Sequence, residues 1–219
     1  YHPSILIINN IEFYHADIYE NVEMIENNFF ELIKTMPSNS KVLINDTRVS
    51  ESFKNNLNKQ KFKTKLRFLS LSASNIHEEN KMLAAHAIEE ILPKNKVISS
   101  LESYEGVKRR FETIFEDQDF KLVDDFAHHP TAIEETIKMI KEQTNNLVLI
   151  VELGSNSMKK GIHDKRLINI FKNQDTFIIN ASPEQRKIFA NHAKEITEKD
   201  VSLICSANVE KKTILMCGN

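Results

Sequence analysis

From Arg110 to the end of the chain, short apolar runs alternate with segments of helical periodicity. Such alternation builds βαβ units, which place their strands side by side in a mostly parallel sheet. The expected strands cover 111–115, 121–124, 147–151, 176–179, 201–204 and 213–216, and the expected helices cover 131–142, 164–171 and 183–194. The second half of the chain is therefore predicted to be an α/β domain.

The first half of the chain also mixes strands and helices. Helix 19–34 has apolar residues at three- and four-residue spacing, and Pro93 is expected to end helix 79–92. The lysine-rich stretch 59–65 predicts a solvated loop or an edge strand. The expected strands are 4–9, 41–44 and 65–71, and the expected helices are 19–34, 79–92 and 97–104.

A domain boundary is expected near Gly106, one of only four glycines in the chain. Glycine provides the backbone freedom of a hinge, and each flanking block has enough apolar residues for its own core. The predicted domains are residues 1–105 and 106–219.

Composition excludes several classes of function. A net charge of −2 over 219 residues shows no electrostatic footprint for nucleic acid. No run approaches the roughly 20 apolar residues that cross a bilayer, so no membrane insertion is expected. The two cysteines are too few for a disulfide framework, which favours a reducing cytoplasm.

The most informative motif joins the end of strand 121–124 to the helix that begins at Pro130. It brings together Asp124, Asp125, His128 and His129. The free N–H groups of a helix N-terminus attract phosphate or carboxylate, and the acids can accept hydrogen bonds from ribose or hold a cation through water. The alternative is structural, with Asp125 capping a turn and the histidines on the surface.

Three weaker clusters accompany this motif. Glu12, His15 and Asp17 follow the first strand and offer ligands for a divalent ion, or else form a loop with an aspartate cap. Arg109 and Arg110, after the hinge, can grip phosphate at the domain junction or be ordinary surface charge. The small polar residues of 154–161 form a substrate loop or a plain turn.

In this order the motifs resemble the Mur ligase family over most of the chain. The resemblance rests on Asn10 to Asp17 (NIEFYHAD), Glu105 to Glu112 (EGVKRRFE), Asp124 to Ile133 (DDFAHHPTAI) and Ser155 to Lys159 (SNSMK). It implies the C-terminal part of a central ATPase domain followed by a Rossmann-like, mostly parallel α/β domain.

The resemblance also implies ATP- and Mg²⁺-dependent amide-bond synthesis through an acyl phosphate. It is strongest to members that join UDP-N-acetylmuramate to the L-Ala-γ-D-Glu-meso-diaminopimelate tripeptide in peptidoglycan recycling, in the bacterial cytoplasm. Chemistry of this kind depends on positioning and on neutralising phosphoryl charge.

The resemblance assigns roles residue by residue. His15 and Asp17 match a magnesium site, and His15, Arg109 and Arg110 match the catalytic set. The nucleotide positions are Asn80, Asp124, Asp125, His128 and His129, and the peptide positions are Ser155, Asn156 and Lys159.

Three departures from the family pattern set further expectations. The phosphate-binding Gly-x-x-x-x-Gly-Lys loop does not occur in the chain, so this chain alone should bind ATP poorly and be inactive. Glu78 stands in the segment expected to contact adenine, and Gly154 stands where an arginine is expected.

Two other functions stay open from the residues. The paired aspartates and histidines could gather the metal centre of a phosphoesterase. Alternatively, Glu78 and Gly154 could mark a relative that binds wall precursors without turnover.

Overall fold

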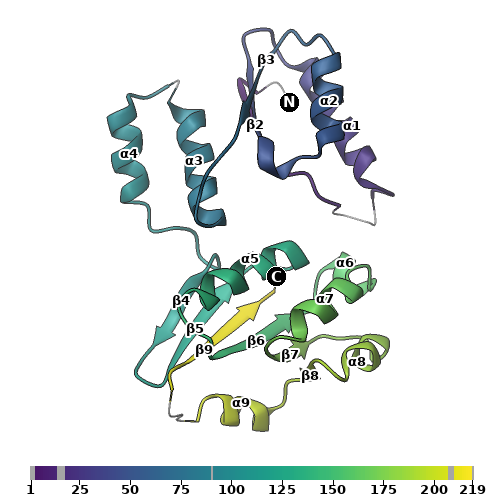
Figure 1. Ribbon diagram of the computed structural model, residues 1–219, viewed down its shortest axis with the longest axis vertical. Helices are drawn as coiled ribbons and strands as arrows, with labels where there is room; N and C mark the ends of the chain where they lie inside the picture. The colour runs from purple at the N-terminus through teal and green to yellow at the C-terminus, as the bar shows by residue number, and fades with distance from the viewer. Residues whose placement is uncertain (1–2, 14–17, 90, 207–209, 219) are drawn as a thin grey trace. The chain divides into compact units, whose positions relative to one another are not determined.

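The computed structural model describes residues 3–13, 18–89, 91–206 and 210–218. The chain divides into two compact units, Tyr1–Glu105 (unit 1) and Gly106–Asn219 (unit 2), which are drawn in Figure 1. Each unit has its own sheet and its own apolar core. No helix of the described ranges is long and apolar enough to span a membrane.

Unit 1 contains a parallel sheet of three strands in the order β1-β2-β3. These strands are β1 (Ile5–Ile8), β2 (Lys41–Asn45) and β3 (Lys65–Leu69). The central strand β2 is a nearly continuous apolar run because both of its faces are covered. Its carboxyl end, together with that of β1, forms the edge at which the polar residues of this unit gather.

Helices cover both faces of this sheet (Figure 1). Val42 and Ile44 of β2 pack with Phe30 and Phe53 on one face, whereas Leu43 packs with helix α3 on the other. The helices are α1 (Val22–Thr35), α2 (Glu51–Lys59), α3 (Ile76–Ile88) and α4 (Lys94–Glu102), and a short 3₁₀ turn, η1 (Asp46–Arg48), follows β2.

Two sequence predictions about unit 1 are wrong. Helix α2 lies between the predicted strands 41–44 and 65–71, where no helix was expected, because its apolar face consists of just Phe53 and Leu57, both fully buried. Helix α3 starts three residues early, at the Asn75 cap, and ends at Ile88 rather than at Pro93. Ile91, which the predicted helix 79–92 included, lies outside α3 and is 70% exposed.

Unit 2 contains a sheet of six strands in the order β4-β5-β9-β6-β7-β8. All described pairs are parallel except β4 with β5, so the expectation of a mostly parallel α/β domain is confirmed. The strands are β4 (Glu112–Glu116), β5 (Phe120–Asp125), β6 (Leu147–Glu152), β7 (Asp175–Ile179), β8 (Lys194–Glu195) and β9 (Lys212–Cys217).

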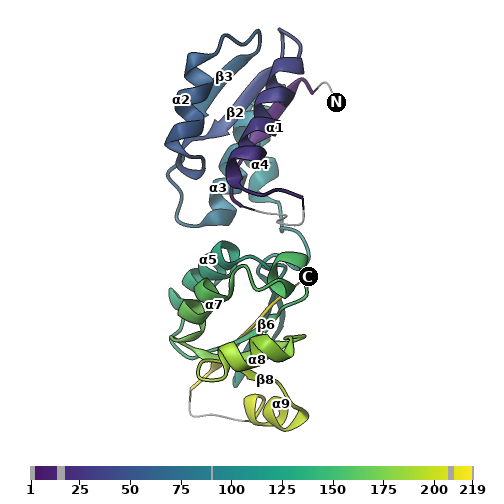
Figure 2. The same cartoon turned by 90° about the vertical axis from the view of Figure 1, so that its right-hand side faces the viewer.

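The helices of unit 2 lie on both faces of its sheet. Leu149 and Val151 of β6 join the main core under three helices, α5, α7 and α8, and Val148 packs with Ile204 of α9 on the opposite face. Figure 2 shows α5 and α7 together on one side of the sheet. The helices are α5 (Pro130–Lys141), α6 (Asn156–Lys159), α7 (Asp164–Phe171), α8 (Pro183–Phe189) and α9 (Glu198–Ile204).

The predicted strand 201–204 is wrong, because this segment is part of helix α9. Its β-branched residues favour a strand locally, but Thr197 and Asp200 form a capping box that starts a helix. The predicted helix 183–194 is too long, since it ends at Phe189 and Lys194 then joins the sheet as β8. Residues 156–159, expected in a loop, form the single turn α6.

Candidate functional site

The acidic pair Asp124 and Asp125 lies at the carboxyl end of β5, as its spacing predicts, but the two side chains differ. Asp125 is only 4% exposed. Its Oδ1 accepts a hydrogen bond from the Ala127 amide at 2.8 Å, and its Oδ2 accepts bonds from the Phe111 amide at 3.0 Å and the Thr136 hydroxyl at 3.2 Å. Asp125 therefore ties the end of β5 to the residues before β4 and to helix α5.

Asp124 instead pairs with Arg109. The Arg109 Nε atom lies 3.1 Å from Asp124 Oδ2, and Arg109 Nη2 donates to the Gly218 carbonyl at 3.1 Å. Arg109 and Phe111 have φ of 58° and 53°, in the left-handed region that non-glycine residues rarely adopt. The two aspartates thus hold both ends of a strained three-residue turn, with Arg110 at its centre.

Phe126 organises the cations of this turn. The guanidinium carbons of Arg109 and Arg110 each lie 5.1 Å from its ring centroid, within cation–π range, and the His128 ring contacts it edge-on at 5.2 Å. Arg110 is exposed, and no carboxylate of the described ranges pairs with it. Of the two arginines, Arg110 is the one whose charge remains available to an anion.

The two histidines of the motif are placed differently. His128 Nδ1 lies 2.9 Å from the Phe126 carbonyl oxygen on the half-buried side of the turn. His129 is 4% exposed at the start of α5, and its ring packs edge-to-face on His163, with centroids 4.6 Å apart. Sequence reasoning missed His163, since no spacing links it to a residue 34 positions earlier.

The expected peptide residues form the turn α6, directly after β6. The Ser155 hydroxyl caps this turn by accepting from the Met158 amide at 3.4 Å, and Asn156 lies in its first position. Lys159 is exposed. Because β5, β9 and β6 are adjacent and parallel, these residues lie at the same sheet edge as Asp124, where α/β sheets usually bind ligands.

Gly218 packs so closely in this edge that alanine should not fit. An added Cβ would lie 2.6 Å from Glu152 Cβ. We expect Gly218→Ala to lower the free energy of unfolding by about 1 to 3 kcal/mol, measured by urea denaturation. Gly106→Ala is the comparison, because its φ of 98° is strained but no atom lies within 4 Å. Equal effects of the two substitutions would contradict a steric origin.

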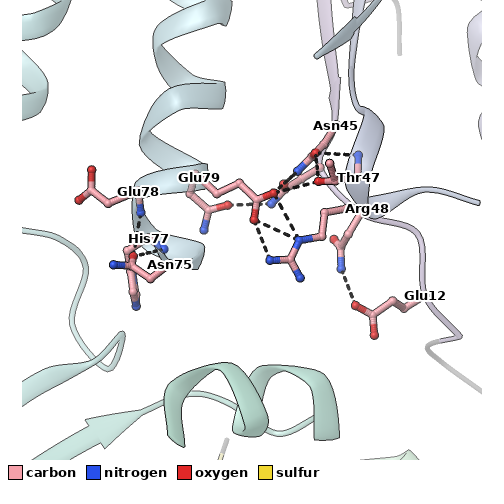
Figure 3. Close-up of polar contacts among 11 residues, drawn as sticks. Glu12, Asn45, Thr47, Arg48, Asn75, His77, Glu78 and Glu79 are labelled. Atoms are coloured by element: carbon pink, nitrogen blue, oxygen red, sulfur yellow. Dashed lines mark hydrogen bonds and ion pairs between the residues drawn. The ribbon is translucent and has the colours of Figure 1, made fainter. Parts of the chain in front are cut away.

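In unit 1 a network of polar side chains connects β1, β2 and α3 (Figure 3). Glu79 is the centre: its carboxylate accepts from Arg48 Nη2 at 2.8 Å and from Asn45 Nδ2 at 2.9 Å. Asn9, at the end of β1, donates to Asn80 Oδ1 at 2.8 Å. The predicted nucleotide residue Asn80 is thus exposed beside a half-buried ion pair that sequence reasoning missed.

The charge of Glu79 should make unit 1 less stable in acid. Burial alone would raise the pKa of Glu79, but the hydrogen bonds from Arg48 and Asn45 outweigh it and hold the pKa below the ordinary 4.5. A carboxyl group with a lowered folded-state pKa contributes stability above its unfolded pKa, and this contribution is lost as the pH falls through the folded value.

Urea unfolding of the wild type and Glu79→Gln between about pH 7 and about pH 3 checks this prediction. The stability advantage of the wild type should be constant near neutrality and should shrink below the ordinary carboxyl pKa of 4.5. An advantage that does not change with pH would show that Glu79 has no charge linkage.

The predicted metal residues His15 and Asp17 lie outside the described residues. Glu12, their predicted neighbour, accepts from Asn10 Nδ2 at 3.3 Å. Within the described ranges, no group of three or more His, Cys, Asp or Glu side chains is arranged to hold a metal ion. The motif 124–129 therefore does not gather such a group by itself.

Comparison with known proteins identifies both units. The family model "Mur ligase middle domain" matches residues 1–98, and "Mur ligase, glutamate ligase domain" matches residues 109–211. Together they account for nearly all of the chain.

Individual relatives carry related names. The UDP-N-acetylmuramate–L-alanyl-γ-D-glutamyl-meso-2,6-diaminoheptandioate ligase of Haemophilus influenzae is 27% identical, over 84% of this chain and 48% of that protein. The UDP-N-acetylmuramate–L-alanine ligase of Clostridium kluyveri is 26% identical, over 95% and 51%.

A solved structure has the same fold. The murein peptide ligase of Psychrobacter arcticus superimposes with a TM-score of 0.67 at 22% identity, over 100% of this chain and 55% of that one. The chain spans about half the length of the curated relatives it matches. On both family matches, the chain belongs to the Mur ligase family.

Proposed function

We propose that the protein joins UDP-N-acetylmuramate to the L-Ala-γ-D-Glu-meso-diaminopimelate tripeptide in peptidoglycan recycling. The observation that carries the proposal is the turn 109–111, which presents the Arg110 cation on Phe126 at the carboxyl edge of the unit 2 sheet. The similarity to the Haemophilus influenzae ligase supports this choice of peptide.

The proposed reaction has two steps. The muramoyl carboxylate attacks the γ-phosphorus of ATP, and the bond to ADP breaks, which gives an acyl phosphate. The tripeptide amine then attacks the acyl carbon, phosphate leaves with the electron pair, and the amine loses a proton. Both steps move negative charge on phosphoryl oxygens, so a positioned guanidinium lowers their barriers.

The residues take roles that suit this chemistry. Arg110 binds the phosphoryl oxygens, and Arg109 holds the turn through Asp124. Asp125 has a structural role in the motif, since protein donors already occupy both of its oxygens. Its predicted direct contact with ribose stays a prediction, as do the nucleotide contacts of His128 and His129.

The remaining assignments complete the proposal. Residues 1–105 are the later part of the central ATP-binding domain, and 106–219 are the ligase domain. His15 and Asp17 would hold Mg²⁺, which supplies further neutralisation of phosphate charge. Ser155, Asn156 and Lys159 would meet the incoming peptide, and Lys159 is exposed as this role requires.

Product analysis tests the proposal. The protein as its source organism makes it is incubated with ATP, Mg²⁺, UDP-N-acetylmuramate and the tripeptide, and ADP and UDP-N-acetylmuramoyl-tripeptide are measured. ADP release that requires both substrates supports the proposal. No such release, with or without precursor binding, would overturn it and would favour a non-catalytic relative.

The main alternative to the tripeptide as the amine substrate is L-alanine. The Clostridium kluyveri relative is named for ligation of L-alanine, and it matches 95% of this chain. The same assay with L-alanine in place of the tripeptide therefore compares the two amines at equal concentration. A higher kcat/KM for L-alanine would reassign the peptide substrate and leave the ligase reaction intact.

A further inference from the structure

The Glu79 carboxylate is fully engaged at the centre of the unit 1 network (Figure 3). The residue is 5% exposed, and its two oxygens accept from Arg48 Nε and Nη2 and from Asn45 Nδ2. An ionised carboxylate accepts hydrogen bonds and donates none. Every neighbour of Glu79 must therefore turn a donor towards it.

This requirement sets the orientation of the Asn45 amide. Asn45 Nδ2 lies 2.9 Å from Glu79 Oε1, so Asn45 Oδ1 faces the other way and accepts from the Thr47 hydroxyl at 2.9 Å. The assignment follows from the acceptor-only partner and does not depend on seeing hydrogen atoms. Asn45 is fully buried, which leaves it no solvent partner.

The orientation of the Asn45 amide in turn sets the orientations of the Asn9 and Asn80 side-chain amides. Asn45 Nδ2 also reaches Asn9 Oδ1, at 3.4 Å, so Asn9 turns its Nδ2 outward and donates to Asn80 Oδ1 at 2.8 Å. Asn80 is exposed, and its oxygen is directed towards Asn9. The Asn80 Nδ2 group, with its N–H donors, is therefore the part of the amide that faces solvent.

We propose that Glu79 and Arg48 are positioning residues that fix the Asn80 amide with its N–H donors outward, through Asn45 and Asn9. Asn80 then selects a ligand with a hydrogen-bond acceptor, such as a purine ring nitrogen of a nucleotide. This inference rests on the proposed function for the identity of that nucleotide. Arg48 contributes by keeping Glu79 ionised and in place.

The variant Glu79→Gln tests the relay because it keeps the shape but adds an N–H donor. In the ligase assay we expect KM for ATP to rise about three- to tenfold with kcat within about twofold, which is the scale of one hydrogen bond. The wild type should also discriminate against at least one of 1-, 3- and 7-deaza-ATP, each of which lacks one ring acceptor. Glu79→Gln should lose that discrimination.

Two controls distinguish an effect of Glu79 on the Asn80 amide from a general loss of stability or activity. Glu134→Gln weakens an exposed arginine pair in unit 2 and should change neither KM nor discrimination. In an Asn80→Ala background, Glu79→Gln should add no further rise in KM, because the relay has lost its last member. Additive effects, an unchanged KM in Glu79→Gln, or a wild type that accepts all three analogues equally would overturn the inference.

A readout without turnover keeps the inference distinct from the proposed function. In ¹H–¹⁵N spectra the Asn9 side-chain amide should exchange with water more slowly in the wild type than in Glu79→Gln, because it is hydrogen bonded to Asn80. Equal exchange rates of the Asn9 amide in the wild type and in Glu79→Gln would overturn the relay, even if the protein is an active ligase. Slower exchange in the wild type of a protein that lacks ligase activity would support the relay and overturn only the proposed function.

Discussion

Replacing Asp125 by alanine should lower the free energy of unfolding of unit 2 by about 2 to 4 kcal/mol. The substitution removes the acceptor of the Phe111 and Ala127 amides, whereas the Thr136 hydroxyl can still donate to the Ala132 carbonyl. Donors left without partners inside a protein cost more than the bonds themselves contributed. Urea denaturation, with hydrogen exchange of the β5 amides to report on unit 2, measures the effect.

Asp117→Ala is a matched control for this prediction. Asp117 also accepts two backbone amides, those of Asp119 and Phe120, but it is exposed. Water can replace its carboxylate, so we expect a loss of about 1 kcal/mol or less. If Asp125→Ala were as mild as Asp117→Ala, the buried carboxylate would not be what holds the turn 109–111.

Arg110→Ala should lower kcat/KM of the proposed ligase reaction by about a hundred- to a thousandfold. The same change should cost less than about 1 kcal/mol of stability, because its contact among the described residues is the ring of Phe126. Steady-state kinetics and thermal unfolding of the same preparation separate the two effects. Arg110→Lys should recover part of the activity, since it keeps the charge and loses the planar fork.

Arg186→Ala is the control for a lost surface arginine. Arg186 pairs with Glu195 on the exposed side of unit 2, and its loss should leave kcat/KM within about twofold. Arg109→Ala should behave differently from both, because it leaves Asp124 and the Gly218 carbonyl without their partner and therefore reduces stability. Activity of Arg110→Ala equal to that of Arg186→Ala would remove Arg110 from the proposed mechanism.

Sequence reasoning succeeded where the signal is local. Helix 164–171 was predicted with its observed bounds, because its amphipathic periodicity is visible in the residues themselves. It failed at α9, where the apolar β-branched run around Val201 outweighed the Thr197 capping box. It also failed at α2, whose two core residues are too few to make a periodic pattern.

The candidate site was found in part for the same reason. The motif 124–133 places acids, histidines and a helix start within ten residues, so its position at the end of β5 could be predicted. The partners of those residues could not be predicted from the sequence. Arg109 donates to the carbonyl of Gly218, which lies 109 positions later in the chain, and His129 contacts His163, which lies 34 positions later.

The alternation of apolar runs and helical segments is a property of neighbouring residues, and it was enough to establish an α/β chain and the edge at which unit 2 carries its polar motif. Strand order and register depend on contacts between residues far apart in the chain. Only those contacts made Asp125 a buried support, left Arg110 as the accessible cation, and joined Glu79 to Arg48 across 31 positions. The hydrogen bonds that distinguish these roles form only once the strands are paired, because each needs donor and acceptor within about 3.5 Å.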